Sequence, residues 1–280
     1  MKKMKLPTGA LIVLRTIRRS AYLCAVIILL ALIVWLLHER AGTSISNAYE
    51  DISYALAPSA QKAMYYGDLH FSATDWAHYD IARAKYFFYL AAQSDPTLPY
   101  VWHQLARVSF IQDDLVKAKV QIDYQIAQHG DATPESFYMR GLIEAFMTDY
   151  AAAEVDYAHY MTLNPISWAG ANDYAWVLLK DGKPMRADHV VSLLLPYYPK
   201  NVWLLNTDAI ALSEMGSSTA ARQRIEQAST VLPSLTAMDW SRAYPGNDPL
   251  TAADGIAQFK SAVTSNIHSI MSGVPIKVLQ

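Results

Sequence analysis

The chain has almost no cysteine and little net charge. A single cysteine, Cys24, stands among its 280 residues, so neither an intrachain disulfide nor a cysteine-based zinc cluster can form. The 23 basic and 25 acidic side chains leave a formal net charge of −2, whereas a general nucleic-acid binder carries an excess of positive charge on its folded part. The hydrophobic content of 52% excludes an intrinsically disordered chain.

Motifs that mark common enzyme classes are also absent. There is no phosphate-binding glycine loop, no G-x-S-x-G elbow, no H-E-x-x-H helix and no EF-hand loop. The adjacent Asp113 and Asp114 lie at a predicted inter-helix turn, where such residues are typical of a helix cap. The sequence therefore predicts a non-enzymatic protein that holds no cofactor and no metal.

The densest polar cluster lies in one predicted inter-helix turn. It holds two imidazoles and three carboxylates, namely Asp68, His70, Asp75, His78 and Asp80. Such side chains can ligate zinc or manganese, but their spacing matches no common ligand pattern. A metal-dependent or enzymatic module at Asp68–Asp80 is therefore the alternative hypothesis to a solvated polar turn.

One long apolar run stands near the amino terminus. Residues 21–37 carry no charge, and a helix of this length spans roughly 26 Å, close to the ~30 Å hydrocarbon core of a bilayer. The run is longer than the apolar core of a cleaved signal peptide, and no A-x-A site closes it. An uncleaved transmembrane signal anchor is favoured over a cleaved signal peptide.

The charges around this run predict its orientation. Residues 1–37 hold six basic residues and no acidic one, whereas residues 38–280 hold the other 17 basic and all 25 acidic ones. Under the positive-inside rule the tip stays in the cytoplasm and the C-terminal domain is extracytoplasmic, at the inner (plasma) membrane. The lipid bilayer is then a partner through residues 21–37, and the acidic body argues against nucleic acid as a partner.

An internal repeat of about 34 residues fills most of the chain. Five marker alanines recur at intervals of 34, 35, 34 and 34 residues: Ala84, Ala118, Ala153, Ala187 and Ala221. Four positions after each stands a large apolar or aromatic residue: Phe88, Ile122, Tyr157, Val191 and Ile225. Twelve positions after each stands a helix breaker: Pro96, Gly130, Pro165, Pro199 and Pro233.

A second column of small residues accompanies the first. Twelve positions before four of the marker alanines stand Ala106, Gly141, Ala175 and Ala209. Two small residues at this spacing let a pair of helices approach closely, the large residue fills the groove between neighbouring pairs, and the breaker ends the second helix. The spacing predicts helix–turn–helix repeats.

These repeats resemble the tetratricopeptide-repeat family. The similarity is carried by Trp102-x-x-Leu105-Ala106, by Asp149-Tyr150-Ala-Ala-Ala153-x-x-x-Tyr157 with Asn164-Pro165, and by the stretch Asn172–Gly182. The resemblance covers roughly residues 61–234. It implies an all-α, right-handed helical-repeat solenoid of about five helix–turn–helix units.

Four further segments surround this solenoid. They are a basic cytoplasmic tip (1–20), the transmembrane anchor (21–37), a linker or lead-in helix (38–60), and a turn-rich segment with a C-terminal capping helix (235–280). The turn-rich stretch runs through Asp248-Pro249, and the capping helix is predicted from Thr251 to about Ser272. One face of that helix carries Ala253, Ile256, Phe259, Val263 and Ile267.

Two repeats depart from the pattern. In the first, Tyr66-Gly67 stands about five residues too early for the small-residue column, so Asp68–Asp80 is predicted to be an enlarged turn. In the second, Gln125 takes the place of an expected small residue.

The resemblance also implies that the first helix of each repeat lines a concave groove. The groove positions carried over are Tyr100, His103, Arg107, Tyr138, Leu142, Asn172, Trp176, Lys180, Trp203 and Asn206. Asn172 and Asn206 share one repeat position, so their carboxamides are predicted to hydrogen-bond an extended peptide backbone. Only Arg107 and Lys180 bring fixed positive charge, which argues against an adaptor for acidic tails.

The sequence thus favours a membrane-anchored scaffold that binds a protein or peptide partner in this groove and helps to assemble an envelope complex. A purely structural subunit of a membrane complex, in contact through its convex face or its terminal helix, is a further alternative.

Overall fold

The computed structural model describes residues 26–29, 45–244 and 246–274, and helices are the only regular elements in these ranges. The chain forms two compact units, residues 1–58 and residues 59–280. In the first unit, residues 45–56 are helical. The predicted membrane segment lies outside the described residues apart from the helical stretch 26–29, and no helix in the described ranges is both long and apolar enough to cross a bilayer.

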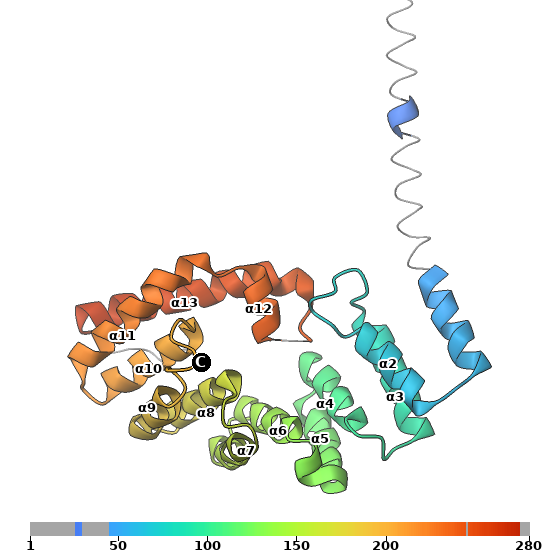
Figure 1. Cartoon of the computed structure of the whole chain (residues 1–280), viewed down its shortest axis with the longest axis horizontal. Coiled ribbons are helices and arrows are strands. Elements are labelled where there is room, and N and C mark those ends of the chain that lie inside the picture. The colour runs from blue at the N-terminus through green and yellow to red at the C-terminus, as the bar shows by residue number, and fades with distance from the viewer. Residues whose placement is uncertain (1–25, 30–44, 245, 275–280) are drawn as a thin grey trace, which may run out of the picture. The chain divides into compact units, whose positions relative to one another are not determined.

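The second unit is an array of helix pairs (Figure 1). The five pairs are α2 (Ala60–Leu69) with α3 (Ile81–Ser94), α4 (Val101–Ile111) with α5 (Leu115–His129), α6 (Glu135–Phe146) with α7 (Tyr150–Leu163), α8 (Trp168–Lys180) with α9 (Pro184–Ser192), and α10 (Val202–Glu214) with α11 (Ser218–Val231). After them come α12 (Ala237–Ala243) and α13 (Ala252–Ser272), and 3-10 turns occupy Gly130–Ala132, Leu232–Ser234 and Pro249–Thr251. The predicted all-α repeat array is confirmed.

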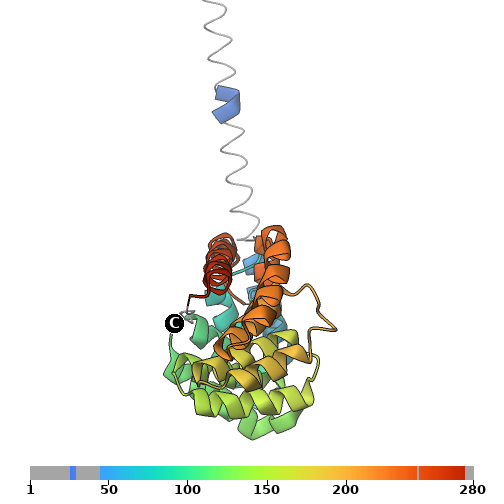
Figure 2. The same cartoon turned by 90° about the vertical axis from the view of Figure 1, so that its left-hand side faces the viewer.

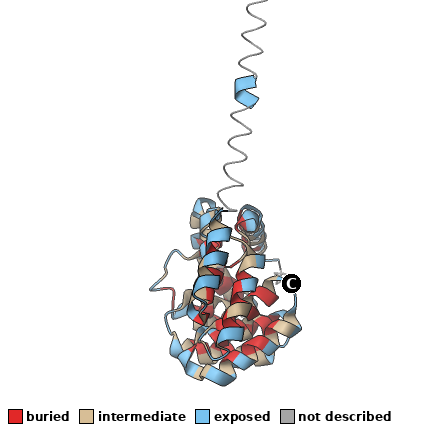
Figure 3. Ribbon diagram, turned by 90° about the vertical axis from the view of Figure 1, so that its right-hand side faces the viewer, coloured by how far each residue is buried: buried red, intermediate tan, exposed pale blue. Residues whose placement is uncertain are grey.

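The marker alanines lie at the centre of the packing. All five are completely buried, and so are the five large residues that stand four positions after them. Buried residues gather between the helices, and exposed residues gather on the outer faces (Figure 3). The marker alanines and the large residues after them therefore make the contacts that hold each helix pair together and join it to the next pair.

Close helix approach explains two glycines in the small-residue column. A Cβ atom on Gly141 would lie only 3.1 Å from the Tyr157 ring, and one on Gly67 would overlap the Phe88 ring. Gly67 therefore has the same role in α2 that Gly141 has in α6. The eleven-residue loop 70–80 accommodates the earlier position of Gly67, whereas the other four helix pairs are each joined by three residues. The enlarged first turn is confirmed.

Gln125 replaces a small residue because it caps a neighbouring helix. Its side chain is fully buried, and its Oε1 accepts hydrogen bonds from the backbone N–H groups of Trp102 (3.2 Å) and His103 (3.3 Å). The N-cap residue of α4, Tyr100, has a left-handed φ of 68° and makes no side-chain cap. Gln125 thus satisfies amide groups that every helix leaves unpaired at its start.

The turn-rich stretch after the last repeat is more helical than the sequence predicts. Its short helix α12 begins with a capping box in which Thr236 and Asp239 exchange side-chain-to-backbone hydrogen bonds. In α13 the predicted helix is confirmed within one residue. Its buried face begins at Ala252, and the predicted Ala253 is exposed.

The C-terminal segment runs back across the open side of the array toward its first repeat (Figure 1). Helix α13 packs against α10 and α11, and α11 and α13 lie side by side in Figure 2. At the other end of the segment, the Tyr79 hydroxyl donates a hydrogen bond of 2.8 Å to the carbonyl of Gly246. The expected capping helix therefore covers the last repeat, while the chain before it contacts the first-repeat loop.

Candidate functional site

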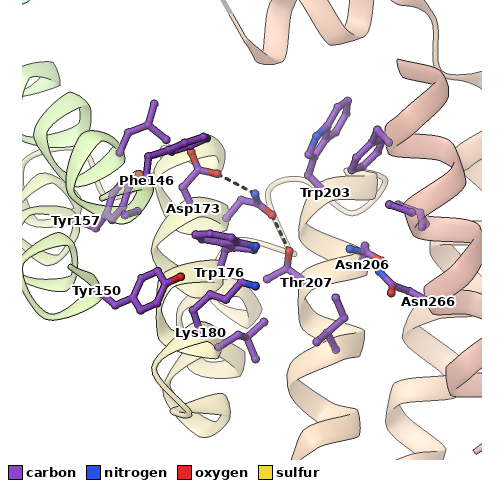
Figure 4. A pocket seen from close by; sticks show the side chains of 18 of the residues that line it. Phe146, Tyr150, Tyr157, Asp173, Trp176, Lys180, Trp203, Asn206, Thr207 and Asn266 are labelled. Carbon is purple, nitrogen blue, oxygen red and sulfur yellow. Dashed lines mark hydrogen bonds between the residues drawn. The ribbon is translucent and has the colours of Figure 1, made fainter. Parts of the chain in front are cut away.

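A cavity of about 780 Å³ opens between α6, α8, α10 and α13. We call it the central cavity (Figure 4). Its lining is largely apolar and aromatic, with side chains that include Leu142, Phe146, Tyr150, Trp176, Ile210 and Phe259. Its volume falls within the roughly 300–1,000 Å³ that is typical of ligand-binding pockets.

One wall of the central cavity joins an aromatic surface to a cation. Trp176 and Lys180 stand one helical turn apart on α8, so they share a face. The Lys180 Nζ lies 5.2 Å from the centre of the Trp176 ring, and the Tyr150 ring lies 6.2 Å from that ring, nearly perpendicular to it. Partial burial lowers the pKa of Lys180.

A chain of four hydrogen-bonded side chains links three first helices beside this wall. Asp173 accepts two hydrogen bonds. The Tyr138 hydroxyl donates to its Oδ2 (2.5 Å), and Nδ2 of Asn172 donates to the Oδ1 of Asp173 (3.0 Å). The Thr207 hydroxyl donates to Oδ1 of Asn172 (2.8 Å; Figure 4). Burial raises the pKa of Asp173, against the effect of its two donors. The chain fixes the orientation of the polar groups that α8 and α10 present at the cavity.

The opposite wall is formed where α13 meets α10. The Trp203 ring is stacked on the Phe259 ring, with centroids 4.6 Å apart, and its Nε1 donates to the Tyr244 hydroxyl at 3.1 Å. The Asn266 Nδ2 donates to Oδ1 of Asn206 at 3.0 Å (Figure 4). Groups that the sequence assigns to a peptide partner are here in contact with the C-terminal segment of the same chain.

Comparison with known proteins finds solved structures that share this architecture. No family model matches the chain, and no curated protein matches it. YrrB, a TPR protein with an unusual peptide-binding site, aligns with a TM-score of 0.53 and 14% identity over 67% of this chain and 92% of YrrB. PilF of Pseudomonas aeruginosa aligns with a TM-score of 0.55 and 15% identity over 76% and 99% of the two chains. A tetratricopeptide-repeat protein of Parabacteroides merdae gives 0.50 and 13% over 76% and 81%.

The fold is the tetratricopeptide-repeat fold. Identities this low extend to the fold alone. Within it, six of the ten predicted groove residues line the central cavity: Leu142, Asn172, Trp176, Lys180, Trp203 and Asn206. They belong to the first helices of the third, fourth and fifth tetratricopeptide repeats.

The other four predicted residues lie outside the lining of this cavity. His103 is buried, with Nδ1 3.2 Å from the Ser136 hydroxyl, which corrects the expectation that it faces an open groove. Burial, with a smaller effect of the Arg107 charge, lowers the pKa of His103 to about 3, so it is neutral at physiological pH. Arg107 itself lies over the Phe71 ring at 4.7 Å.

Tyr100 and Tyr138 are joined to neighbouring repeats by hydrogen bonds. The Tyr100 hydroxyl donates to Oε2 of Glu135 at 2.6 Å, and Tyr138 donates to Asp173 as described above. Each tyrosine therefore connects the first helix of its own tetratricopeptide repeat to that of the next repeat. This is a packing role within the array.

The cavity also contains residues that the repeat pattern does not select. Phe146 and Tyr150 flank the turn of the third repeat, Thr207 adjoins Asn206, and Phe259 and Asn266 come from α13. The sequence does contain an indication for Asn266, because this residue stands beside Val263 and Ile267 on the predicted apolar face of its helix. For Phe146 the sequence gives no indication beyond its position at the end of a first helix.

The enlarged turn does not assemble a metal site. His70 Nδ1 lies 2.8 Å from the carbonyl of His78, and Arg83 donates to its Nε2. Asp80 caps α3, and Asp68 accepts a hydrogen bond from Gln104. Only His78 and Asp75 of the cluster meet, with Nδ1 of His78 2.8 Å from Oδ2 of Asp75. The described residues contain no group of three or more His, Cys, Asp or Glu placed to hold an ion. The alternative hypothesis of a metal module at this turn is corrected accordingly.

Proposed function

We propose that this protein is a non-enzymatic, membrane-anchored scaffold whose central cavity binds a short, largely apolar segment of a protein partner. The observation that carries the proposal is the cavity itself: an aromatic pocket on the first helices of three successive repeats, with oriented amides and one lysine at its edge. Aromatic anchors in a concave site supply most of the binding free energy in such interfaces. Its likeness to YrrB, a TPR protein with a peptide-binding site, supports the same class of partner.

The contacts of α13 argue for a short segment. The Phe259 ring is stacked on Trp203, and Asn266 is hydrogen-bonded to Asn206. A peptide therefore cannot follow the concave face past α10 without displacing α13. The accessible binding surface is the α8 wall, with Trp176 and Lys180, together with Phe146 at the end of α6. We expect an apolar side chain of the partner to lie against Trp176, with backbone groups near Asn172 and Thr207.

The anchor and its orientation are part of the proposal. The uncharged run 21–37 and the six preceding basic residues support a single-pass protein of the bacterial inner membrane with its repeats on the outer side, where they would assist assembly of an envelope complex. Alkaline extraction of membranes and protease treatment of spheroplasts test this. Extraction of the full chain by alkali, or protection of the repeats from protease, would contradict it.

The cavity is tested by two matched substitutions in the full-length protein. Phe146 lines the cavity with 60% of its surface exposed, and Val155 on α7 is 68% exposed outside it. Phe146→Glu is expected to lower partner recovery after crosslinking in native membranes by about 10-fold or more, equivalent to ~1.4 kcal/mol. Val155→Glu is expected to leave recovery unchanged. Substitutions at Asn172 or Asn206 are less diagnostic, because both side chains also hold the fold together.

A second candidate function rests on the convex face. Tyr86, Val120 and Val155 each stand two positions after a marker alanine and are 52%, 66% and 68% exposed. They form an apolar row over the second helices of the first three repeats, which suits a structural subunit in contact through that face. In the same experiment, loss of the partner with Val155→Glu and not with Phe146→Glu would favour this function.

A further inference from the structure

The helix of the first unit has an exposed apolar stripe. Ile45, Tyr49, Ile52 and Leu56 are 69%, 67%, 59% and 81% exposed, although they are the large apolar residues of the helical stretch 45–56 apart from Tyr54. An isolated exposed apolar residue is ordinary on a protein surface, whereas a continuous stripe along one helix marks an interaction surface.

The spacing of this stripe is that of a coiled-coil seam. The four residues follow one another at intervals of four, three and four, which is the alternation of d and a positions in a heptad. The flanking e and g positions hold Ser46, Ala48, Ser53 and Ala55, and no charge enters the seam. Glu50 and Asp51 stand at the b and c positions, away from it.

We propose that residues 45–56 of two copies of this chain pair as a parallel two-helix coiled coil. This inference rests on the proposed membrane anchor. The anchor ends at residue 37, only seven residues before the helix, so two copies in one bilayer present the same helix at the same height and in the same direction. Parallel pairing in register then follows without a turn of the chain.

The short length of the seam makes the anchor necessary. A helix of this length is marginally stable alone in water, so two free copies would pair weakly. Confinement to one membrane converts pairing into an encounter at a high effective concentration. The seam adds direction and register to that encounter.

The charges of this segment favour a second copy over the bilayer surface as the occupant. A helix that lies in the membrane interface carries lysine and arginine on its polar face. Between Arg40 and Lys62 this chain has no basic residue, and of its two acidic residues Glu50 is buried and Asp51 is exposed. The segment therefore offers an anionic bilayer no positive charge to attract it.

Cysteine crosslinking along the helix tests the pairing. In a full-length Cys24→Ser background, single cysteines are placed in the seam (Tyr49→Cys, Ile52→Cys, Leu56→Cys) and off it (Asn47→Cys, Asp51→Cys), and native membranes are oxidised. Disulfide-linked dimer is expected to be about 10-fold more abundant at the seam positions, because only facing side chains meet the short Cβ separation of a disulfide. Equal yields at all five positions, no dimer, or a maximum off the seam would each overturn the proposal.

A second variant separates pairing from folding. Ile52→Asp, read with the crosslink at position 56, is expected to abolish the dimer. Asn47→Asp, at an f position on the opposite side of the helix, is expected to preserve most of it. Alkaline extraction of the same membranes reports on the anchor independently. Retention in the membrane without a heptad pattern would reject the pairing alone, whereas heptad-patterned crosslinks in an extractable chain would reject the anchor alone.

Discussion

Asp208 and Arg224 form a buried ion pair with the polarity opposite to that of an equivalent pair two repeats earlier. Arg224 Nε donates to Oδ2 of Asp208 at 2.5 Å. In the third repeat the same two positions hold Arg140 and Asp156, again 2.5 Å apart and with a second bond of 2.7 Å. Both aspartates are almost completely buried. The site between the paired helices therefore accepts an ion pair in either direction.

Reversal of the fifth-repeat pair is predicted to be tolerated only as a double change. Asp208→Arg alone places two guanidinium groups together, and Arg224→Asp alone adds a carboxylate beside Asp208 and Asp188. Each is expected to lower the free energy of unfolding by roughly 3 kcal/mol or more. The double variant recreates the third-repeat arrangement and is expected to lie within about 1 kcal/mol of the unmodified protein. Urea unfolding measures all three, and a double variant no better than the singles would refute the equivalence of the two sites.

Glu144 is predicted to make the protein less stable as the pH rises toward neutrality. Burial, together with the charge of the neighbouring Asp156, raises the pKa of Glu144 from its ordinary 4.5 to about 7, although Lys119 and Arg140 oppose the shift. The folded state therefore binds this proton more tightly than the unfolded state does. The corresponding stability is present below pH 4.5 and is lost as the pH rises through about 7.

Glu144→Gln keeps the side chain neutral and is expected to remove this loss. Its unfolding free energy, measured in urea at pH 5 and at pH 8, is expected to fall less between the two values than that of the unmodified protein. Glu226→Gln, at an exposed glutamate of α11, is the control and should leave the pH dependence as it was. An unaltered dependence in Glu144→Gln would contradict the assignment.

Gln125→Ala is predicted to destabilise the protein, although alanine is the residue type that the repeat pattern favours at this position. The substitution leaves the amides of Trp102 and His103 without their acceptor and opens a cavity at a fully buried site. We expect a loss of about 2–4 kcal/mol in unfolding free energy. Gln93→Ala, at an exposed glutamine of α3, is the matched control. Equal stability of the two variants would show that α4 needs no cap from Gln125.

Two substitutions are predicted to weaken the contact between the first repeat and the C-terminal segment to different extents. Tyr79→Phe removes one hydrogen bond to Gly246 and is expected to cost about 1 kcal/mol. Gly246→Ala is expected to cost more, because this residue has a φ of +98° and a Cβ atom would lie 2.5 Å from the Arg107 guanidinium. Hydrogen exchange of the amides in residues 246–250 is the measurement. Faster exchange in Tyr79→Phe than in Gly246→Ala would reverse the predicted order.

The parts of the fold that the sequence predicts are the ones that rest on regular spacing. Ala84 and its four counterparts, with the large residues after them, determine the helix pairs because each contact recurs about every 34 residues. The path of the C-terminal segment depends instead on single contacts between distant residues. Tyr79 and Gly246 are 167 positions apart, and Asn206 and Asn266 are 60 apart. Neither contact recurs along the chain, so no repeat pattern in the sequence predicts it.

The candidate site divides in the same way. The α8 wall follows from the repeat register, which selects Asn172, Trp176 and Lys180. The α13 wall does not. The repeat register predicts that Asn206 binds a peptide backbone, whereas in the folded chain its Oδ1 accepts a hydrogen bond from Asn266. Gln125 shows the converse case, in which a departure from the pattern marks a local need for a hydrogen-bond acceptor.

The contact between Tyr79 and Gly246 also bears on how this unit folds and unfolds. An open array of repeats can fray from either end, since each repeat contacts only its neighbours and stability is close to a sum of local contributions. Here the first-repeat loop and the segment beyond the last repeat hold one another, so neither end can open without breaking a contact that spans most of the unit. Unfolding is then expected to be a single cooperative event, and folding to be slower than in an open array, because a long loop must close before its contacts form.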